Sequence, residues 1–266
     1  MIDLGRYSVC GIDIDAVDYD AAVARILDHA RTKRALSVSA LAVHGVMTGV
    51  LDPEHLHRLN QLDLVVPDGQ PVRWALNLLH KQNLTQRVYG PELTLRVCAA
   101  AEQQGVPVYF HGSQDRVLEK LTQNLRERFP ALKIAGATPS RFRQLSDAEN
   151  MEMIEKISAS GAGIAFVGLG CPRQEVFAFE NARDLSMPLL AVGAAFDFHA
   201  GLLSQAPAWM QDRGLEWFYR LCMEPGRLWR RYAYLNPLFC LEVAKQYTGI
   251  NRKQAPVSEP PVLRYG

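Results

Sequence analysis

The amino-acid sequence predicts an α/β protein with a Rossmann-like, mostly parallel sheet, helices on both faces of the sheet, and a helical C-terminal appendage. Short apolar runs alternate with longer amphipathic segments through residues 1–203, and several of these runs end in a glycine turn. After Gly201 the strand candidates cease, and arginine and aromatic residues become frequent. Because strands that are separated by helices pair in parallel, ligands are expected at the carboxyl ends of the strands.

Six apolar runs have the length and composition of buried strands. Each is short, rich in Val, Ile, Leu, Ala or Phe, and bounded by a polar segment or a glycine turn. The runs are Ala35–Val43, Leu62–Val66, Val106–His111, Lys133–Ala137, Ile164–Gly168 and Leu189–Val192.

Helical periodicity fills the gaps between these runs. Asp18 is placed to cap a helix that continues to about Thr32. Apolar residues also recur with a period of about 3.6 residues in Gly90–Gln104 and Asp115–Phe129. Residues 1–203 are therefore expected to form one α/β catalytic core.

Residues 204–250 are expected to form the helical appendage. Gln205–Tyr247 contains three of the four tryptophans, and five arginines lie between its start and Tyr232. Because proline inside a helix removes a backbone hydrogen bond, Pro225 and Pro237 are expected to divide the appendage into separate helices. The proline-containing stretch 251–266 is expected to be a disordered tail.

The composition is that of a soluble globular protein: 266 residues, 48% hydrophobic, 21% charged, with a formal net charge of +1. Such a balance gives no general preference for nucleic acid. The five cysteines include no Cys-x-x-Cys pair, so neither a disulfide framework nor a zinc site is indicated, and a reducing cytoplasm fits best. No signal peptide is expected, and no apolar window reaches the roughly 18 residues of a membrane span.

The turn Gly168–Glu175 is the strongest local signal for a binding site. Glycines without side chains allow backbone N–H groups to approach a phosphate, and Pro172 suits the first turn of a helix whose positive N-terminus faces the anion. An ordinary strand-to-helix turn is the alternative for a turn that stands alone. The candidate residues here are Gln174 and the substrate-binding candidates Gly168, Gly170, Pro172, Arg173 and Glu175.

Asp68 is the first catalytic candidate. It ends the buried run Leu62–Val66 and precedes Gly69, at the edge of the sheet where ligands collect. A carboxylate that is partly shielded from water has a raised pKa and can accept a proton from an attacking sugar hydroxyl. Capping of the following helix is an equally good explanation of Asp68 when it is taken alone.

Two further turns give weaker signals. Gly112 and Ser113 follow the third apolar run, and Ser113 or Asp115 is placed to cap the next helix. Asp197 follows the last run and either lines the site or fixes a loop, with the loop role slightly favoured.

Three arginines of the appendage form the other strong signal. Arg220, Arg227 and Arg231 stand seven and four residues apart, so helical segments can place them on one side. Guanidinium groups grip diphosphate in pairs and can neutralise a departing nucleotide diphosphate. A solvated basic face paired with Glu216 and Glu224 is the alternative. The interleaved aromatic residues argue against that alternative. They suit a headgroup layer or a lipid-linked substrate, and equally a small core or an oligomer interface.

The sequence predicts no metal site. Two Asp-x-Asp pairs lie within residues 13–20, where acidic residues cap the first helix and complement its dipole. His55 and His57 are two residues apart on an expected helix and therefore face different directions. The other histidines show no ligand spacing, although His44 and His111 lie near predicted strand ends.

Five ordered blocks closely resemble the WecG/TagA/CpsF glycosyltransferases, which form glycosyltransferase family 26. The resemblance runs from about residue 8 to residue 248, and its blocks are together far more specific than any single glycine turn. The blocks are Pro67–Gly69, Gly168–Glu175, Phe196–Gly201, Ala206–Pro207 and Leu215–Tyr232.

This resemblance implies an inverting bacterial enzyme without metal or cofactor. It would move a sugar from a UDP-sugar to a polyprenyl-diphosphate-linked acceptor at the cytoplasmic face of the membrane, in the synthesis of cell-surface polysaccharide. By position, Asp68 would be the general base, Gln174 would position substrate, and Arg220, Arg227 and Arg231 would complete the active site. The resemblance also implies an appendage that closes over the site and contacts the membrane, and a homo-oligomer.

Two departures from the family pattern lie where sugar or acceptor contacts are expected. Family members carry Thr-x-Asn after the first strand, whereas Ser39–His44 retains only Ser39, and the family's Arg-Ala-Pro reads Gln205–Pro207. Ser39 and His44 complete the substrate-binding candidates. The donor sugar is therefore open among N-acetylmannosamine, its uronic acid and glucose.

A catalytically silent scaffold that binds a UDP-sugar is the alternative function. An NAD-dependent dehydrogenase is a weaker alternative, because no Gly-x-Gly-x-x-Gly follows the first strand.

Overall fold

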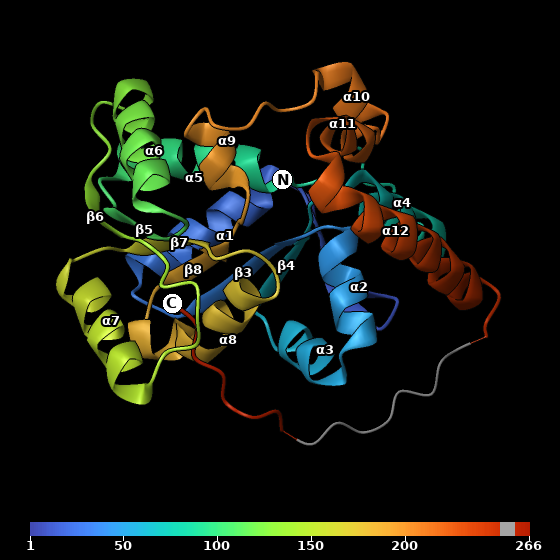
Figure 1. The fold of residues 1–266 in the computed structure, drawn as a ribbon, viewed down its shortest axis with the longest axis horizontal. Coiled ribbons are helices and arrows are strands. Elements are labelled where there is room, and N and C mark those ends of the chain that lie inside the picture. Colours follow the sequence, from blue (N-terminus) through green and yellow to red (C-terminus); the bar gives the residue numbers. More distant parts are fainter. Residues whose placement is uncertain (251–258) are drawn as a thin grey trace.

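The computed structural model describes residues 1–250 and 259–266, and a six-stranded parallel sheet forms its centre (Figure 1). The strands lie in the order β4-β3-β8-β7-β5-β6. Each predicted apolar run overlaps one strand, and the bounds differ by at most two residues. The α/β prediction is therefore confirmed. The strands are β3 (Leu36–Leu41), β4 (Leu64–Pro67), β5 (Val108–Gly112), β6 (Ile134–Thr138), β7 (Ile164–Gly168) and β8 (Pro188–Ala191).

Helices cover both faces of the sheet, as the sequence predicts, because successive side chains of each strand point to opposite sides. Phe110 and Phe166 pack into the first helical layer, whereas their neighbours Tyr109 and Val167 pack into the second. The first layer consists of α1 (Tyr19–Arg31), α5 (Gly90–Gln104), α6 (Asp115–Arg128) and α9 (Ala195–His199). The second consists of α2 (Val43–Leu51), α3 (Pro53–Asn60), α4 (Gln70–His80), α7 (Asp147–Ala159) and α8 (Arg173–Leu185), with part of α12.

An antiparallel hairpin that the sequence did not predict precedes this sheet. It consists of β1 (Asp3–Val9) and β2 (Ile12–Val17). The acidic residues around it have structural roles, as expected. Asp15 is buried, accepts a hydrogen bond from the Val65 N–H and forms ion pairs with Arg6 and Arg25. Asp18 caps α1 by accepting the Ala21 N–H at 2.8 Å.

The appendage contains the three helices α10 (Ala208–Asp212), α11 (Glu216–Met223) and α12 (Pro225–Tyr247). Pro225 begins α12 and separates it from α11, as predicted. The prediction for Pro237 is wrong, because this proline lies inside α12. Burial of Phe239 and Val243 in the second core offsets the hydrogen bond that Pro237 removes. Within the described residues, no helix combines the length and apolar content that crossing a bilayer requires.

The C-terminal segment differs from the expected disordered tail. Residues 251–258 of that tail lie outside the described part of the chain. The segment 259–266 lies against the core, where the buried Arg58 donates to the Pro261 carbonyl at 2.7 Å. Ser140 donates to a terminal oxygen of Gly266 at 2.8 Å. A segment rich in proline can thus be ordered, because side chains of the core donate hydrogen bonds to its backbone carbonyl groups.

Candidate active site

One large cavity lies at the carboxyl ends of the strands, where the fold predicts a ligand site. Its volume is about 1170 Å³, and its walls come from two sources. The turns after β3, β4, β7 and β8 form the side that belongs to the core. Helices α11 and α12 form the opposite side. The appendage therefore faces the carboxyl edge of the sheet across a space large enough for a sugar nucleotide.

Asp68 follows directly after β4 and lines this cavity. Its Oδ1 accepts the Gly90 N–H, at the start of α5, at 2.6 Å. Asp68 does not cap the following helix, because the N-cap of α4 is Gly69 and no side chain bonds there. Burial raises the pKa of Asp68 to about 6, and the nearby Arg87 opposes that rise. Near neutral pH the carboxylate is ionised yet close enough to its pKa to accept a proton.

Arg87 connects Asp68 to the appendage. Its Nη2 lies 2.7 Å from Glu216 Oε2 on α11 and 3.0 Å from Gln211 Oε1. Its guanidinium also stacks 4.1 Å from the centre of the Tyr89 ring. Sequence reasoning missed Arg87, because it lies in an irregular segment between two helices and has no periodic or motif signal.

A glycine lets the appendage approach the core closely. Gly214 has a φ of +69°, and a Cβ on it would lie 2.5 Å from the Trp74 ring of α4. Any larger residue would therefore displace Trp74 or the turn before α11.

The Gly168–Glu175 turn leads from β7 into α8, as predicted, and contributes to the cavity floor. Gln174 Nε2 donates to Glu175 Oε1 at 2.8 Å, and the Ser39 hydroxyl donates to the same oxygen at 3.4 Å. Gln174 Oε1 is buried without a partner among the described residues. This amide oxygen is thus a free acceptor in the wall of the cavity, suited to a ligand hydroxyl.

The turn after β5 contributes less than expected. Gly112 lies beside Gly168 in the sheet with a φ of +118°, and a Cβ on it would lie 2.6 Å from the Gly168 backbone. Close packing of β5 against β7 therefore explains why position 112 is a glycine. Ser113 lines the cavity, but neither it nor Asp115 caps α6, whose N-cap is Gln114.

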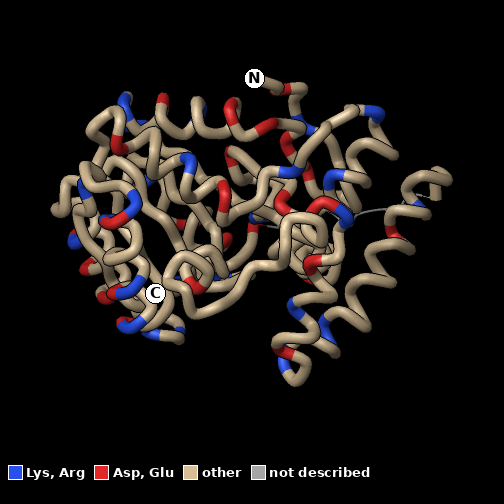
Figure 2. Tube along the Cα trace, turned by 90° about the horizontal axis from the view of Figure 1, so that it is seen from above, with Lys and Arg blue, Asp and Glu red and all other residues tan. Residues whose placement is uncertain are grey.

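The three predicted arginines reach one cavity from two helices. Arg220 lies on α11, and Arg227 and Arg231 lie on α12. Figure 2 shows basic positions gathered where these helices meet. Arg227 pairs with Glu224 at 2.5 Å, whereas Arg220 and Arg231 have no ion-pair partner among the described residues. Burial and the neighbouring Arg227 lower the pKa of Arg231, which is the effect of crowded, unpaired positive charge.

His44 and Asp197 also line the cavity. Burial, reinforced by Arg231, His55 and Arg220, lowers the pKa of His44 to about 4, so its imidazole is neutral at physiological pH. Burial raises the pKa of Asp197, and Arg227 opposes this. The Asp197 carbonyl accepts the Leu202 N–H, so the residue both holds a loop and faces the cavity.

Most of the predicted site residues meet at this cavity, and three do not line it. Ser39 is fully buried behind Glu175, Gly112 is a packing position, and Pro172 occupies the N-cap of α8. The predicted residues that line it are Asp68, Gly69, His44, Ser113, Gly168, Gly170, Arg173, Gln174, Glu175, Asp197, Arg220, Arg227 and Arg231.

The sequence profile of the family described as "Glycosyl transferase WecG/TagA/CpsF family" matches residues 7–253. The chain belongs to this family. It is therefore a glycosyltransferase, which confirms the prediction from the sequence blocks and leaves the dehydrogenase alternative without support.

Two similar proteins carry the same name, N-acetylglucosaminyldiphosphoundecaprenol N-acetyl-beta-D-mannosaminyltransferase. The protein from Bacillus spizizenii is 29% identical over 211 residues, which cover 79% of this chain and 76% of the relative. The protein from Bacillus subtilis is 27% identical over 199 residues, which cover 74% of each chain.

Proposed function

We propose that this glycosyltransferase moves a sugar from a UDP-sugar to a polyprenyl-diphosphate-linked acceptor, with inversion at the anomeric carbon. The observation that carries the proposal is the composition of the cavity. A carboxylate with a raised pKa lies on the core side, and arginines without ion-pair partners among the described residues lie on the appendage side. The names of the two Bacillus relatives supply the class of acceptor and the N-acetylmannosamine-type sugar.

We assign binding of the donor's diphosphate to the arginines of the appendage. Arg220 and Arg231 have no ion-pair partner among the described residues, so a diphosphate is the charge partner that best compensates their partial burial. Arg173 lines the same cavity. Such a cluster supplies the positive charge that stabilises a departing UDP.

Asp68 is assigned as the general base. Its carboxylate takes the proton of the acceptor hydroxyl while that oxygen forms a bond to the anomeric carbon of the donor. The bond between that carbon and the diphosphate oxygen breaks on the opposite face, and the electron pair leaves with UDP. Gln174 is assigned to hold a sugar hydroxyl through its unpartnered Oε1. Orientation of the two substrates and electrostatic stabilisation then provide most of the rate enhancement.

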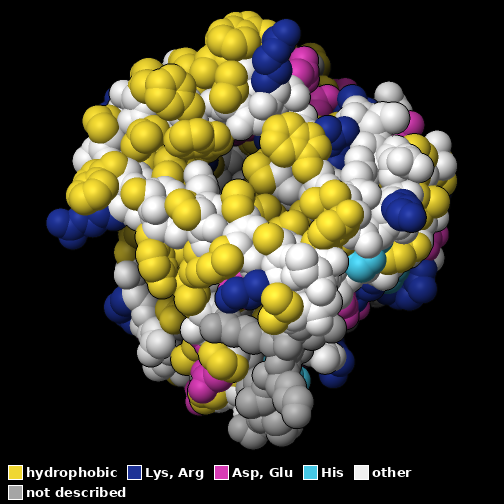
Figure 3. Space-filling view, turned by 90° about the vertical axis from the view of Figure 1, so that its right-hand side faces the viewer, with side chains coloured by type: hydrophobic (Ala, Val, Ile, Leu, Met, Phe, Trp, Pro, Cys, Tyr) yellow, Lys and Arg dark blue, Asp and Glu magenta, His cyan; other side chains and the backbone are white. Residues whose placement is uncertain are grey.

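The appendage is also assigned a contact with the membrane surface that holds the acceptor. Figure 3 faces the side that carries α12 and shows hydrophobic side chains gathered around a hollow. Aromatic rings beside arginines suit the headgroup layer of an anionic bilayer. A peripheral position on the cytoplasmic face would bring the cavity to its lipid-linked substrate. The exposed aromatic residues of the appendage are Trp209, Trp217, Phe218, Trp229, Tyr234 and Tyr247.

A donor panel tests this proposal directly. The full chain is incubated with synthetic polyprenyl-diphosphate-linked N-acetylglucosamine and, separately, with UDP-N-acetylmannosamine, its uronic acid and UDP-glucose. Mass spectrometry should reveal one added sugar for one donor, with release of UDP. Absence of any product from all three donors, with a folded protein that binds UDP, would contradict the proposal.

A further inference from the structure

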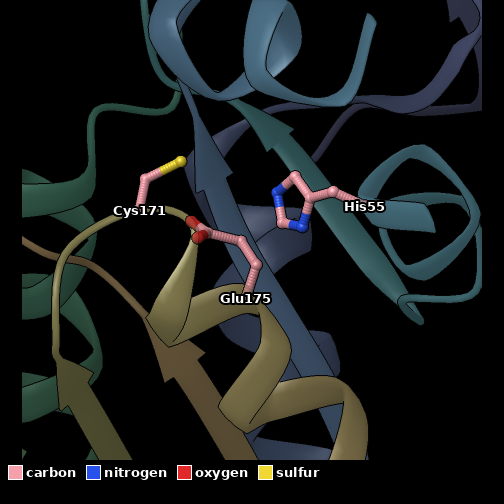
Figure 4. A group of neighbouring side chains, drawn as sticks. All are labelled: His55, Cys171 and Glu175. Carbon is pink, nitrogen blue, oxygen red and sulfur yellow. The ribbon is translucent and has the colours of Figure 1, made fainter. Parts of the chain in front are cut away.

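Three side chains from three separate parts of the fold meet behind the floor of the cavity. His55 comes from α3, Cys171 from the turn after β7, and Glu175 from the first turn of α8. Their ligand atoms, an imidazole nitrogen, a thiol sulfur and a carboxylate oxygen, all lie within 4.8 Å of one another. Figure 4 shows the Glu175 carboxylate turned toward the side of Cys171, with the His55 imidazole on its other side.

Two of the three side chains in this cluster carry buried atoms that have no hydrogen-bond partner among the described residues. His55 is only 1% exposed, and neither of its ring nitrogens has a hydrogen-bond partner among the described residues. Glu175 is also 1% exposed, and its Oε2 is likewise without a partner in the described chain. Leaving a buried polar atom unsatisfied costs about 1–3 kcal/mol, so several such atoms facing one point indicate a missing ligand.

The second carboxylate oxygen of Glu175 is already held in place. Oε1 accepts hydrogen bonds from Gln174 and Ser39, which leaves Oε2 for the cluster. Ligands of metal ions are typically oriented in this way by surrounding hydrogen bonds. Within the described chain, the polar contacts of the Cys171 sulfur are with Glu175 and, at 4.0 Å, with the Thr48 hydroxyl.

We propose that His55, Cys171 and Glu175 form a binding site for one zinc ion. Thiolate, imidazole and carboxylate are the usual ligands of zinc, whereas magnesium and calcium prefer oxygen alone. Zinc–ligand bonds of about 2.0–2.3 Å place tetrahedral ligands roughly 3.5 Å apart, so small side-chain rotations bring these atoms into range. A water molecule from the cavity completes the four ligands.

Charge balance is consistent with this site. A thiolate, a carboxylate and a neutral imidazole together carry two negative charges, which one Zn²⁺ neutralises, so the nearby Arg231 faces a neutral cluster. Burial raises the pKa values of the Cys171 thiol and the Glu175 carboxyl. Zn²⁺ bonds to the sulfur and the oxygen in their deprotonated forms, and any proton that these groups carry leaves to solvent.

The ion would have a structural function that is separate from the proposed transfer reaction. It would join α3 to the turn that carries Arg173 and Gln174, and so fix this wall of the cavity. Sequence spacing could not reveal the site, because His55 is far from Cys171 in the chain and no Cys-x-x-Cys pair is present.

Metal analysis of the full-length chain tests the proposal. The protein is treated with chelator, loaded with zinc, dialysed and measured by atomic emission and by thermal unfolding. We expect one zinc per chain and a rise in Tm of ~5–10 °C at a hundredfold excess over Kd. Cys171→Ser and His55→Gln should each weaken zinc binding by more than ~100-fold. The matched controls Cys222→Ser and His57→Gln should retain full binding.

Cobalt supplies a readout that does not depend on the variants. Co²⁺ added to the zinc-free wild type should give the near-ultraviolet charge-transfer band of a cobalt–thiolate bond together with intense tetrahedral bands. Absence of this band and of stoichiometric zinc would mean that the cluster holds only ordered water, which overturns the proposal. Undiminished zinc binding by folded Cys171→Ser and His55→Gln would overturn it as well.

Discussion

The core and the appendage contribute opposite walls of one cavity, the proposed active site, and they are stabilised very differently. In the core, both faces of the sheet carry fully buried apolar side chains. In the appendage, α10 and α11 have no buried residue, and the described part of α12 buries only Leu228, Phe239, Glu242 and Val243. The core is therefore stabilised mainly by its own hydrophobic layers, whereas the appendage depends on the surface against which it packs.

This difference assigns separate tasks to the two regions. The core holds Asp68 and the glycine turns in fixed positions, and the appendage brings the arginines that face them. The Arg87–Glu216 ion pair is a polar link between the two regions beside Asp68. Changes in the appendage should thus reduce activity while leaving the core folded.

The largest expected effect comes from the core, at its one proposed reacting group. Asp68→Asn should lower kcat by ~10²–10⁴-fold, because the side chain can no longer accept a proton. UDP affinity should stay nearly unchanged, as measured by calorimetry. Burial raises the pKa of Asp68, so its ionised form opposes folding as pH rises through about 6, and Tm of the variant should not fall.

The matched control for that change is Asp184→Asn, an exposed carboxylate on α8. It should retain wild-type kcat. Equal turnover for Asp68→Asn and wild type would remove Asp68 from the chemistry.

The next effect comes from the appendage. Arg231→Gln should lower kcat/KM by ~10²–10³-fold, because one cationic group is lost from the leaving diphosphate. Its neighbour Arg230 stacks on Trp229 and does not line the cavity, so Arg230→Gln is the control and should be close to wild type. Parallel initial-rate measurements check this pair, and equal losses in both variants would indicate a general effect of surface charge.

Most of the core could be predicted from the sequence, because its physical signals are local. The buried strands appear as apolar runs, and α1 starts at Asp18, which caps it as predicted. The N-terminal hairpin could not be recognised, because β1 is largely exposed and lacks a clear alternation. At Pro237 a local signal was misleading: proline usually breaks a helix, but the packing of α12 against the core keeps this helix continuous.

A smaller effect should separate the membrane contact from catalysis. Trp209→Ser, Phe218→Ser and Trp229→Ser should each weaken binding to vesicles that contain anionic lipid by ~10-fold, from the loss of one buried aromatic side chain. Turnover of a water-soluble acceptor should not change for Trp209→Ser or Phe218→Ser. Met151→Ser, an exposed apolar residue on α7, is the control for vesicle sedimentation. Unchanged sedimentation of all three variants would place the membrane contact elsewhere.

The smallest expected effect is a shift of the pH profile by the polar link. In wild type, kcat/KM should fall as pH decreases through about 6, because protonated Asp68 cannot act as a base. Arg87 lowers and Glu216 raises the pKa of Asp68. Arg87→Gln should therefore move the acidic limb to higher pH, and Glu216→Gln should move it to lower pH, each by roughly half a unit. Shifts in the same direction for both variants would contradict this coupling.

The site was predictable only where its residues carry a motif. Asp68, Gln174 and the three arginines stand in blocks that can be recognised along the chain. Arg87 and the His55–Cys171–Glu175 cluster depend on contacts between distant segments. Such contacts follow from the packing of α3 and α11 against the core, which no local pattern encodes.

In the proposed reaction, the appendage holds the donor's diphosphate opposite Asp68 of the core. A structure of the chain with bound UDP is the strictest test of this arrangement, because it gives the distances from the β-phosphate oxygens to the guanidinium groups. We expect contacts of about 2.7–2.9 Å to Arg220 or Arg231, with the β-phosphate facing Asp68 across the cavity. UDP bound elsewhere, or bound in the cavity without contact to any of the three arginines, would contradict it.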